Sequence, residues 1–87
     1  MNLNEFKDCL AKIRENKENR AAQVQNFQNK IWNDEFDNMP ENEKEILRTL
    51  AYDLDYYEPA QELRSEDPSY YGDERLVLEI EKVLSLL

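Results

Sequence analysis

Apolar side chains recur at intervals of three and four residues along four separate stretches of this 87-residue chain. No other feature constrains the fold as strongly, because this spacing gathers the apolar side chains of each stretch on one face of a helix. The single glycine and three prolines are also too few for the frequent tight turns of an all-β fold. The pattern therefore predicts four amphipathic helices around one apolar core.

Each stretch supplies a set of residues that we expect to face this core. In the first two stretches they are Leu3, Phe6, Leu10, Ile13, Ala21, Val24, Phe27 and Ile31, with Trp32 at the edge of the second stripe. In the last two they are Leu47, Leu50, Ala51, Leu54, Leu76, Ile80, Val83 and Leu87, with Val77 and Leu84 beside them. Four short helices of this kind bury their stripes most simply as a small four-helix bundle. The predicted fold is therefore all-α, with a single domain over residues 1–87.

The ends of these helices are marked by residues that favour caps and breaks. Asn2 or Asn4 is expected to cap the first helix. The third helix is expected to begin near Pro40, since proline is tolerated in a first turn. It should end before Pro59, because a proline disfavours helical angles at the residue preceding it. Asp73 is expected to be the N-cap of the last helix.

The inventory of reactive side chains excludes several classes of function. The chain has one cysteine, Cys9, and no histidine, so it lacks an internal disulfide and the ligands of a usual zinc site. We expect no metal and no cofactor. No secretory signal is visible at the N-terminus, and no apolar run approaches the roughly 20 residues of a membrane helix. These features predict a cytoplasmic protein.

The net charge of −9 is distributed unevenly along the chain. Residues 1–33 carry six basic and four acidic side chains, a net +2, whereas residues 34–87 carry five basic and sixteen acidic side chains, a net −11. A field of that sign repels nucleic acids and acidic membrane surfaces and attracts basic proteins. Solubility alone is the competing explanation. We expect a basic protein partner, with no direct binding to nucleic acid or membrane.

Much of this negative charge lies in residues 53–74, DLDYYEPAQELRSEDPSYYGDE, which we call the acidic segment. It holds four tyrosines and only one basic residue, Arg64. Residues 59–72 within it form the longest connection of the chain, a long acidic loop between the third and fourth predicted helices. The segment matches neither a packed strand nor a core helix.

The tyrosines fall into three groups. Tyr52 and Tyr56 are one helical turn apart and point nearly opposite the apolar stripe of their helix, so the core does not explain them. Tyrosine supplies broad, stiff contact area and is favoured at interfaces. Tyr57 leans toward the core and is expected to pack over the end of the bundle. For Tyr70 and Tyr71 two roles stay open, which are contact with a partner and folding back to hold the loop.

Catalysis and calcium binding are both weaker explanations of the acidic segment. Paired carboxylates act as acid and base only where a cleft separates their pKa values, and these lie among exposed, acidic neighbours. An EF-hand loop that began at Asp53 would need glycine sixth and glutamate twelfth, where the chain has Glu58 and Arg64. A loop from Asp67 has Gly72 correctly placed but Leu78 twelfth. We therefore expect the protein not to be an enzyme.

Carboxylates interleaved with aromatic rings are similar to a nucleic acid in charge and in stacking surface. A site that binds RNA through Lys, Arg and aromatic planes would accept such a surface as a decoy. The residues expected to form this partner-binding surface are Tyr52, Asp53, Asp55, Tyr56, Glu58, Glu62, Glu66, Asp67, Tyr70, Tyr71, Asp73 and Glu74.

The stretch LDYYEPAQELRSEDPSYYGDERLVLEIEKVLSLL resembles the C-terminal part of the colicin D immunity protein family and the related immunity proteins of contact-dependent growth inhibition systems. The resemblance covers roughly the last forty residues and rests on Asp55, Tyr57, Glu58 and Pro59, followed by the acidic loop and the last helix. It implies a four-helix bundle that covers the basic active site of a toxin nuclease, typically one that cleaves tRNA. In this chain Ala60 stands where the family has an acid directly after the proline.

The resemblance further implies that Asp55, Glu58 and Glu62 contact the nuclease. The expected function is that of an immunity protein, a monomer that forms a heterodimer with its cognate toxin nuclease domain. An alternative is a small acidic adaptor or regulatory bundle that binds a basic surface of a transcription or translation factor. A further alternative is that the acidic face serves only solvation and the protein self-associates.

Overall fold

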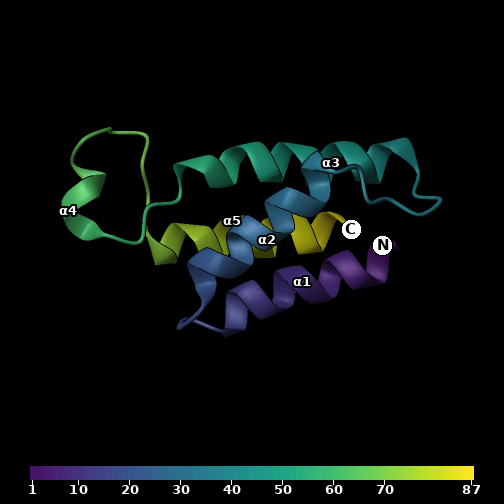
Figure 1. Cartoon of the computed structure of the whole chain (residues 1–87), viewed down its shortest axis with the longest axis horizontal. Helices are drawn as coiled ribbons and strands as arrows, with labels where there is room; N and C mark the ends of the chain where they lie inside the picture. Colours follow the sequence, from purple (N-terminus) through teal and green to yellow (C-terminus); the bar gives the residue numbers. More distant parts are fainter.

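The computed structural model describes residues 1–87 and is all-helical (Figure 1). The four long helices are α1 (Leu3–Glu15), α2 (Arg20–Trp32), α3 (Glu41–Asp53) and α5 (Asp73–Leu86). A 3-10 turn, η1 (Leu54–Tyr56), follows α3. The short helix α4 (Gln61–Arg64) interrupts residues 59–72, which the sequence predicted to be one long loop and which we continue to call the acidic loop. None of these helices combines the length and the apolar character that a membrane span needs.

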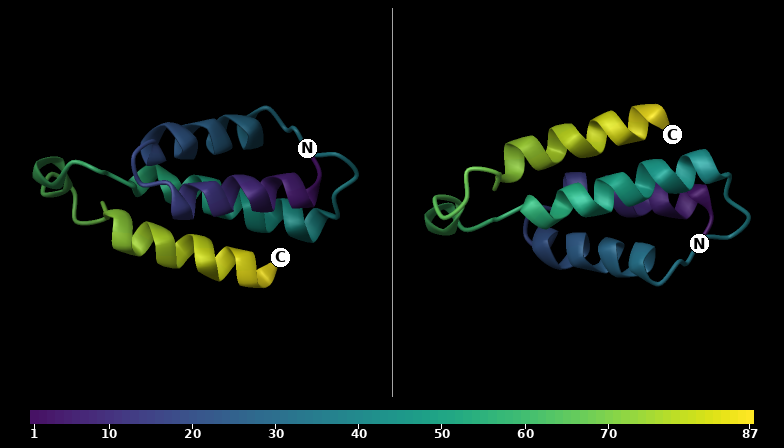
Figure 2. Two further views of the ribbon diagram at one scale, coloured as in Figure 1. Left: turned by 90° about the horizontal axis from the view of Figure 1, so that it is seen from below. Right: turned by 90° about the horizontal axis from the view of Figure 1, so that it is seen from above.

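The long helices lie side by side in a closed ring. Helix α1 contacts α2 and α5, and α3 contacts the same two helices from the other side. Neighbouring helices run antiparallel, as the two further views also show (Figure 2). Both termini lie toward one end of an elongated molecule of 41 × 23 × 22 Å, and the acidic loop projects beyond the opposite end.

One core of apolar side chains fills the space between these helices. Phe6 of α1 and Phe27 of α2 meet edge to face with their ring centroids 6.2 Å apart. The largest fully buried side chains are Phe6, Phe27, Leu10, Ile13, Leu47, Leu54, Leu76 and Ile80. Every one of them belongs to a predicted apolar stripe, so the prediction of the core is confirmed at these positions.

The prediction that Ala21 faces the core is wrong, since Ala21 is exposed and Arg20 is buried, with 6 % of its surface accessible. Position 20 lies four residues before Val24 on the buried face of α2, so it takes the place that the pattern assigned to position 21. An arginine can occupy that place because its guanidinium finds hydrogen-bond acceptors within the protein.

Of the two N-caps predicted for the first and last helices, one is confirmed and the other is wrong. Asn2 caps α1 with a reciprocal pair of hydrogen bonds, in which Asn2 Oδ1 accepts from the Glu5 N–H at 2.9 Å and Glu5 Oε1 accepts from the Asn2 N–H at 3.1 Å. The prediction for Asp73 is wrong. Gly72 holds the N-cap position of α5, and Asp73 is the first helical residue. The Asp73 carboxylate accepts hydrogen bonds from other parts of the chain and is not free to cap the helix.

Helix α3 and the turn η1 end before Pro59, as predicted, and the chain becomes extended at Tyr57. Tyr57 is extended and forms an isolated parallel bridge with Tyr71. The Glu58 N–H donates to the Tyr71 carbonyl at 2.9 Å, and the Tyr71 N–H donates to the Tyr56 carbonyl at 3.0 Å. These two bonds tie together the two ends of the acidic loop.

The connection between α2 and α3 is also fixed by packing. Phe36 packs on Phe6 with a centroid separation of 5.4 Å, and the Arg48 guanidinium lies 5.3 Å from the Phe36 ring centroid. Arg48 Nη1 also bonds Glu41 Oε1 at 2.9 Å. Met39 of the same connection is buried in the core. The end of α2 is therefore held beside α3.

The core can be tested by truncating Leu47, which is fully buried in α3. We expect Leu47→Ala to lower the free energy of unfolding by about 2–5 kcal/mol, because it leaves a cavity among packed side chains. Leu78→Ala is the control, since Leu78 is 64 % exposed on α5 and should cost less than about 0.5 kcal/mol. Urea unfolding followed by circular dichroism measures both. Equal losses for the two variants would contradict the assignment of the core.

Candidate functional site at the acidic end

The acidic segment lies at the end of the molecule opposite both termini (Figures 1 and 2). It is built from the last residue of α3, the turn η1, the acidic loop with α4, and the first turn of α5. The structure thus brings together most of the residues predicted to bind a partner. Their side chains divide into a set that points inward and a set that faces solvent.

Tyr71 and Asp53 belong to the inward set. Tyr71 is 6 % exposed, and its hydroxyl donates to Asp53 Oδ2 at 2.8 Å and to the Asp53 carbonyl at 3.1 Å. Burial raises the pKa of Tyr71, and the hydrogen bond to the Asp53 carboxylate raises it further. The ring also lies under the Arg75 guanidinium, at 5.0 Å from the centroid. Of the two roles left open for Tyr71, the structure shows that it folds back and holds the loop.

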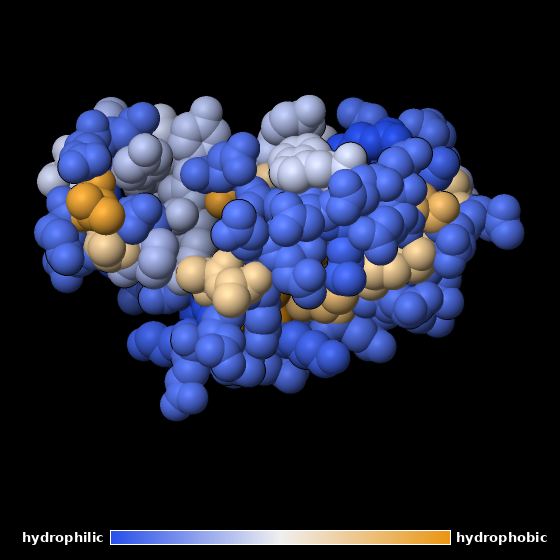
Figure 3. All heavy atoms as spheres, in the orientation of Figure 1, coloured by the Kyte–Doolittle hydropathy of each residue, from blue (hydrophilic) through white to orange (hydrophobic).

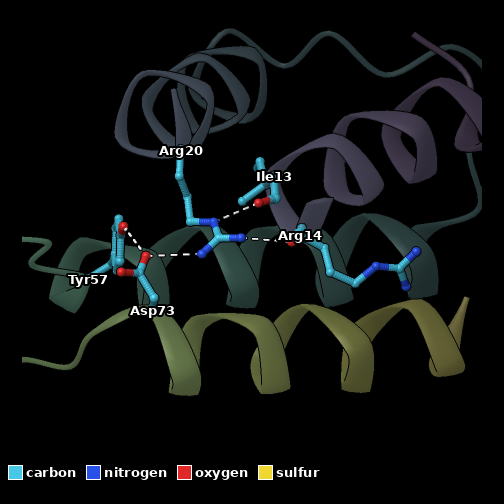
Figure 4. A network of polar contacts seen from close by, with 5 residues as sticks. All are labelled: Ile13, Arg14, Arg20, Tyr57 and Asp73. Atoms are coloured by element: carbon cyan, nitrogen blue, oxygen red, sulfur yellow. Dashed lines mark hydrogen bonds and ion pairs between the residues drawn. The ribbon is translucent and has the colours of Figure 1, made fainter. Parts of the chain in front are cut away.

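Asp73 and Tyr57 form a second inward group around the buried Arg20 (Figure 4). Asp73 Oδ1 accepts from the Tyr57 hydroxyl at 2.7 Å and from Arg20 Nη1 at 3.1 Å. The other guanidinium nitrogens donate to the carbonyls of Ile13, at 2.8 Å, and Arg14, at 2.7 Å. This network joins the end of α1, the start of α2, the start of α5 and the residue after η1.

The protonation states in this network are set by competing effects. Burial alone would raise the pKa of Asp73, but hydrogen bonds from Tyr57 and Arg20 and the charge of Arg20 outweigh it and lower the pKa. Burial, with the hydrogen bond to Asp73 and its charge, raises the pKa of Tyr57 to about 12. At neutral pH the carboxylate is therefore ionised and the phenol is protonated, as the donor and acceptor roles require.

The outward set consists of carboxylates without an ion-pair partner in the chain. None of the salt bridges of the protein involves Asp55, Glu58, Glu62, Glu66 or Glu74. Asp55, Glu62, Glu66 and Glu74 are exposed, and Glu58 is half-buried. Asp67 is half-buried and accepts from the Ser69 N–H at 2.8 Å, which shapes a turn of the loop. The acidic end thus presents negative charge that the protein itself does not neutralise.

Aromatic side chains flank these carboxylates. Tyr52 and Tyr56 are 64 % and 45 % exposed, as their position opposite the apolar stripe predicts. Tyr70 is half-buried. Trp32, at the end of α2, is 45 % exposed and packs against Tyr52 in a tilted arrangement with a centroid separation of 4.8 Å. Sequence reasoning placed Trp32 only at the edge of a stripe, and the pairing of α2 with α3 that brings it to Tyr52 has no local signal.

A polar groove of about 520 Å³ lies beside the start of α5 at the same end of the molecule. Its charged lining residues are three cations and two carboxylates, Lys17, Arg64, Arg75, Asp73 and Glu74. The Arg64 guanidinium packs so closely on Gly72 that a Cβ at position 72 would collide with it. The acidic end is therefore not uniformly negative. A Cβ at position 72 would displace only the flexible end of the Arg64 side chain, so the contact does not by itself require glycine there.

The face drawn in Figure 3 offers little apolar surface to a partner. That face is largely hydrophilic, and its hydrophobic atoms form small separate groups. An extended exposed apolar patch would mark a hydrophobic interface. On this face a partner would meet charged and polar groups in the main.

Comparison of the chain with models of protein families, with curated proteins and with solved structures finds no match. The function is therefore inferred from the arrangement of the chain's own side chains. The two features that matter most are the unpaired carboxylates and the exposed aromatic rings.

The contribution of Arg20 can be measured with Arg20→Met, which keeps much of the aliphatic stem. We expect a loss of about 3 kcal/mol in the free energy of unfolding, because Asp73 and two carbonyls lose their donor. Arg14→Met is the control, since the Arg14 side chain bonds only Glu15 at the surface. Urea unfolding at pH 7 compares the two. Equal stability of the variants would rule out a structural role for the network.

The pKa shifts of Tyr57 and Tyr71 predict that stability falls as pH rises from about 10 to 12. An unfolded tyrosine titrates near pH 10, whereas the folded protein holds these phenolic protons to higher pH. The unfolded state therefore releases protons first and is favoured as pH rises. Urea unfolding at pH 9 and 11.5 should show a smaller drop for the double variant Tyr57→Phe, Tyr71→Phe than for the wild type. Parallel declines would show that these phenols are not responsible.

Proposed function

We propose that the protein is a cytoplasmic immunity protein, a four-helix bundle that binds and neutralises the nuclease domain of a cognate bacterial toxin. The nuclease would be of the tRNA-cleaving kind that the resemblance to the colicin D immunity family implies. The observation that carries the proposal is the set of unpaired carboxylates on a firmly held end of the molecule. They would enter the basic active site of the nuclease and exclude its RNA substrate.

Unpaired charge supports this proposal because it is available to a partner. The salt bridges of the chain leave Asp55, Glu58 and Glu62 without a cation. These are the residues to which the resemblance assigns contact with the toxin. A concentrated negative field also speeds encounter with a basic surface and makes it sensitive to salt.

A fixed geometry also supports the proposal. The bridge between Tyr57 and Tyr71 closes the acidic loop at its base, and the hydrogen bonds of Asp53 and Asp73 hold the two ends of the acidic segment. Ordering these residues before binding reduces the entropy lost in the complex. Asp53, Tyr71 and Asp73 then serve as supports behind the contact surface, and Tyr52 and Tyr56 are the exposed contact anchors.

The proposal is tested with the gene neighbourhood and one assay. An immunity gene should lie directly after a large toxin gene whose last portion is basic. That portion, co-expressed with this chain, should co-purify with it, and its RNA cleavage should be blocked when this chain is present. An orphan gene, or a basic transcription or translation factor as the captured partner, would support the adaptor alternative and overturn the proposal.

The contact residues are tested by reversing two charges, Asp55→Lys with Glu58→Lys. Each loss of a charged partner in an interface costs about 2–5 kcal/mol, so affinity for the toxin domain should fall more than about thirtyfold. The control is Asp8→Lys with Glu18→Lys, which changes net charge equally at exposed positions on or beside α1. Titration calorimetry measures affinity, and circular dichroism checks that helix content is unchanged. Wild-type affinity in the first variant would remove the site assignment.

A further inference from the structure

Two aromatic rings meet on the surface where α2 lies against α3. Trp32 of α2 and Tyr52 of α3 pack against each other with their centroids 4.8 Å apart, in a tilted arrangement with 54° between the ring planes. The exposed fractions of the two residues are 45 % and 64 %. Neither the Trp32 indole N–H nor the Tyr52 hydroxyl is among the hydrogen-bonding groups of the protein. The core accounts for neither ring.

A carboxylate lies on the same seam between the two helices. Gln28 is one turn before Trp32 on α2, and Asp55 is three residues after Tyr52. Gln28 Nε2 donates to Asp55 Oδ1 at 2.8 Å and to the Ala51 carbonyl at 3.0 Å. Asp55 Oδ2 has no partner in the chain, so the acid is held in place with one oxygen unused. Helices α2 and α3 thus present an aromatic pair, and the turn η1 adds a fixed carboxylate one turn farther along the seam.

The cations of the protein do not occupy these rings. The cation–π contacts of the chain are to Phe36, from Lys44 and Arg48, and to Tyr71, from Arg75. Arg48, one turn before Tyr52, is already paired with Asp34, Glu41 and Glu45. A cation that lies over Trp32 or Tyr52 must therefore come from another molecule.

The combination of groups selects a guanidinium over an ammonium. A guanidinium is planar, stacks on aromatic rings and donates several N–H bonds in a fixed fork to a carboxylate. A lysine ammonium is a compact, strongly hydrated charge that gains less from an aromatic plane. The net charge of −11 over residues 34–87 adds a field that attracts either cation.

We propose that Trp32, Tyr52 and Asp55 form a seat for an arginine side chain of the protein partner. This inference rests on the proposed function, which requires a basic protein partner, and it deepens that function in two ways. It adds Trp32 to the contact surface, and it extends that surface from the acidic loop along the seam between α2 and α3. The expected binding mode is stacking on the ring pair with donation to Asp55.

Trp32 is the only tryptophan of the chain, so its fluorescence reports on the seat directly. The probes are tetra-arginine and tetra-lysine peptides, which carry equal charge, at low ionic strength. A cation–π contact of about 1 kcal/mol corresponds to roughly fivefold in affinity. We therefore expect tetra-arginine to bind about fivefold more tightly than tetra-lysine and to change Trp32 emission at saturation.

Matched variants distinguish the contribution of the seat to peptide binding from that of the overall negative charge. Tyr52→Ala and Asp55→Asn should each remove most of the preference for arginine. Tyr52→Phe keeps the ring, and Asp8→Asn removes an equal charge from an exposed position on α1, so both should keep the preference. Equal affinity for the two peptides in the wild type, or an unchanged preference in Tyr52→Ala and Asp55→Asn, would overturn the proposal.

The outcome for the seat is independent of the outcome for the immunity function, since the peptides require no toxin. Nuclease inhibition by a complex in which Trp32 emission stays that of the free protein would overturn the seat and leave the immunity function standing. A preference for arginine peptides together with no inhibition of the cognate toxin would support the seat and remove the immunity function.

Discussion

The buried guanidinium of Arg20 is the interaction on which the arrangement of this protein depends. It is the one charged side chain within the buried set, and it donates to two carbonyls in the last turn of α1 and to the first carboxylate of α5. A buried charge is tolerated only where its donors are satisfied, so these partners must be in place together. Through Tyr57 the same network reaches the residue that follows η1. Four segments of the chain are thereby fixed around one cation.

The acidic side chains of this end of the molecule have two different roles. Asp53 and Asp73 accept hydrogen bonds from tyrosines within the protein and hold the acidic segment in place. Asp55, Glu62 and Glu66 are exposed and are left without a cation. Mutual repulsion among such groups destabilises a compact state, and the tyrosine anchors offset that cost. The resulting surface is negative, aromatic and held in one geometry, which suits a cationic partner.

Periodicity was sufficient to predict the core of the long helices, because burial there depends only on which face a residue occupies. It was not sufficient at α2, where positions 20 and 21 both lie one turn before Val24. The apolar alanine was the natural choice, and only the carbonyls of Ile13 and Arg14 and the Asp73 carboxylate make the arginine tolerable. Met39 was missed for a related reason, since it is buried from a connection that has no period.

The sequence was sufficient to predict which residues lie at the candidate site. It was not sufficient to predict which of their side chains point inward and which face solvent. Exposure of Tyr52 and Tyr56 follows from the helical angle between them and the apolar stripe. The inward roles of Tyr71 and Asp73 depend on contacts across 18 and 16 residues, with Asp53 and Tyr57 respectively. The packing of Trp32 against Tyr52 depends on the register of α2 against α3. No local pattern encodes either kind of contact.

The bridge between Tyr57 and Tyr71 has a consequence for divergence among proteins built in this way. Because Tyr57 and Tyr71 join the chain on either side of residues 59–70, the packing of the long helices does not depend on most of what lies between them. That interval can then be rewritten, in charge or in length, with little cost to the scaffold. A change of binding partner could then be matched by changing this interval alone, while the helices and their anchors are kept.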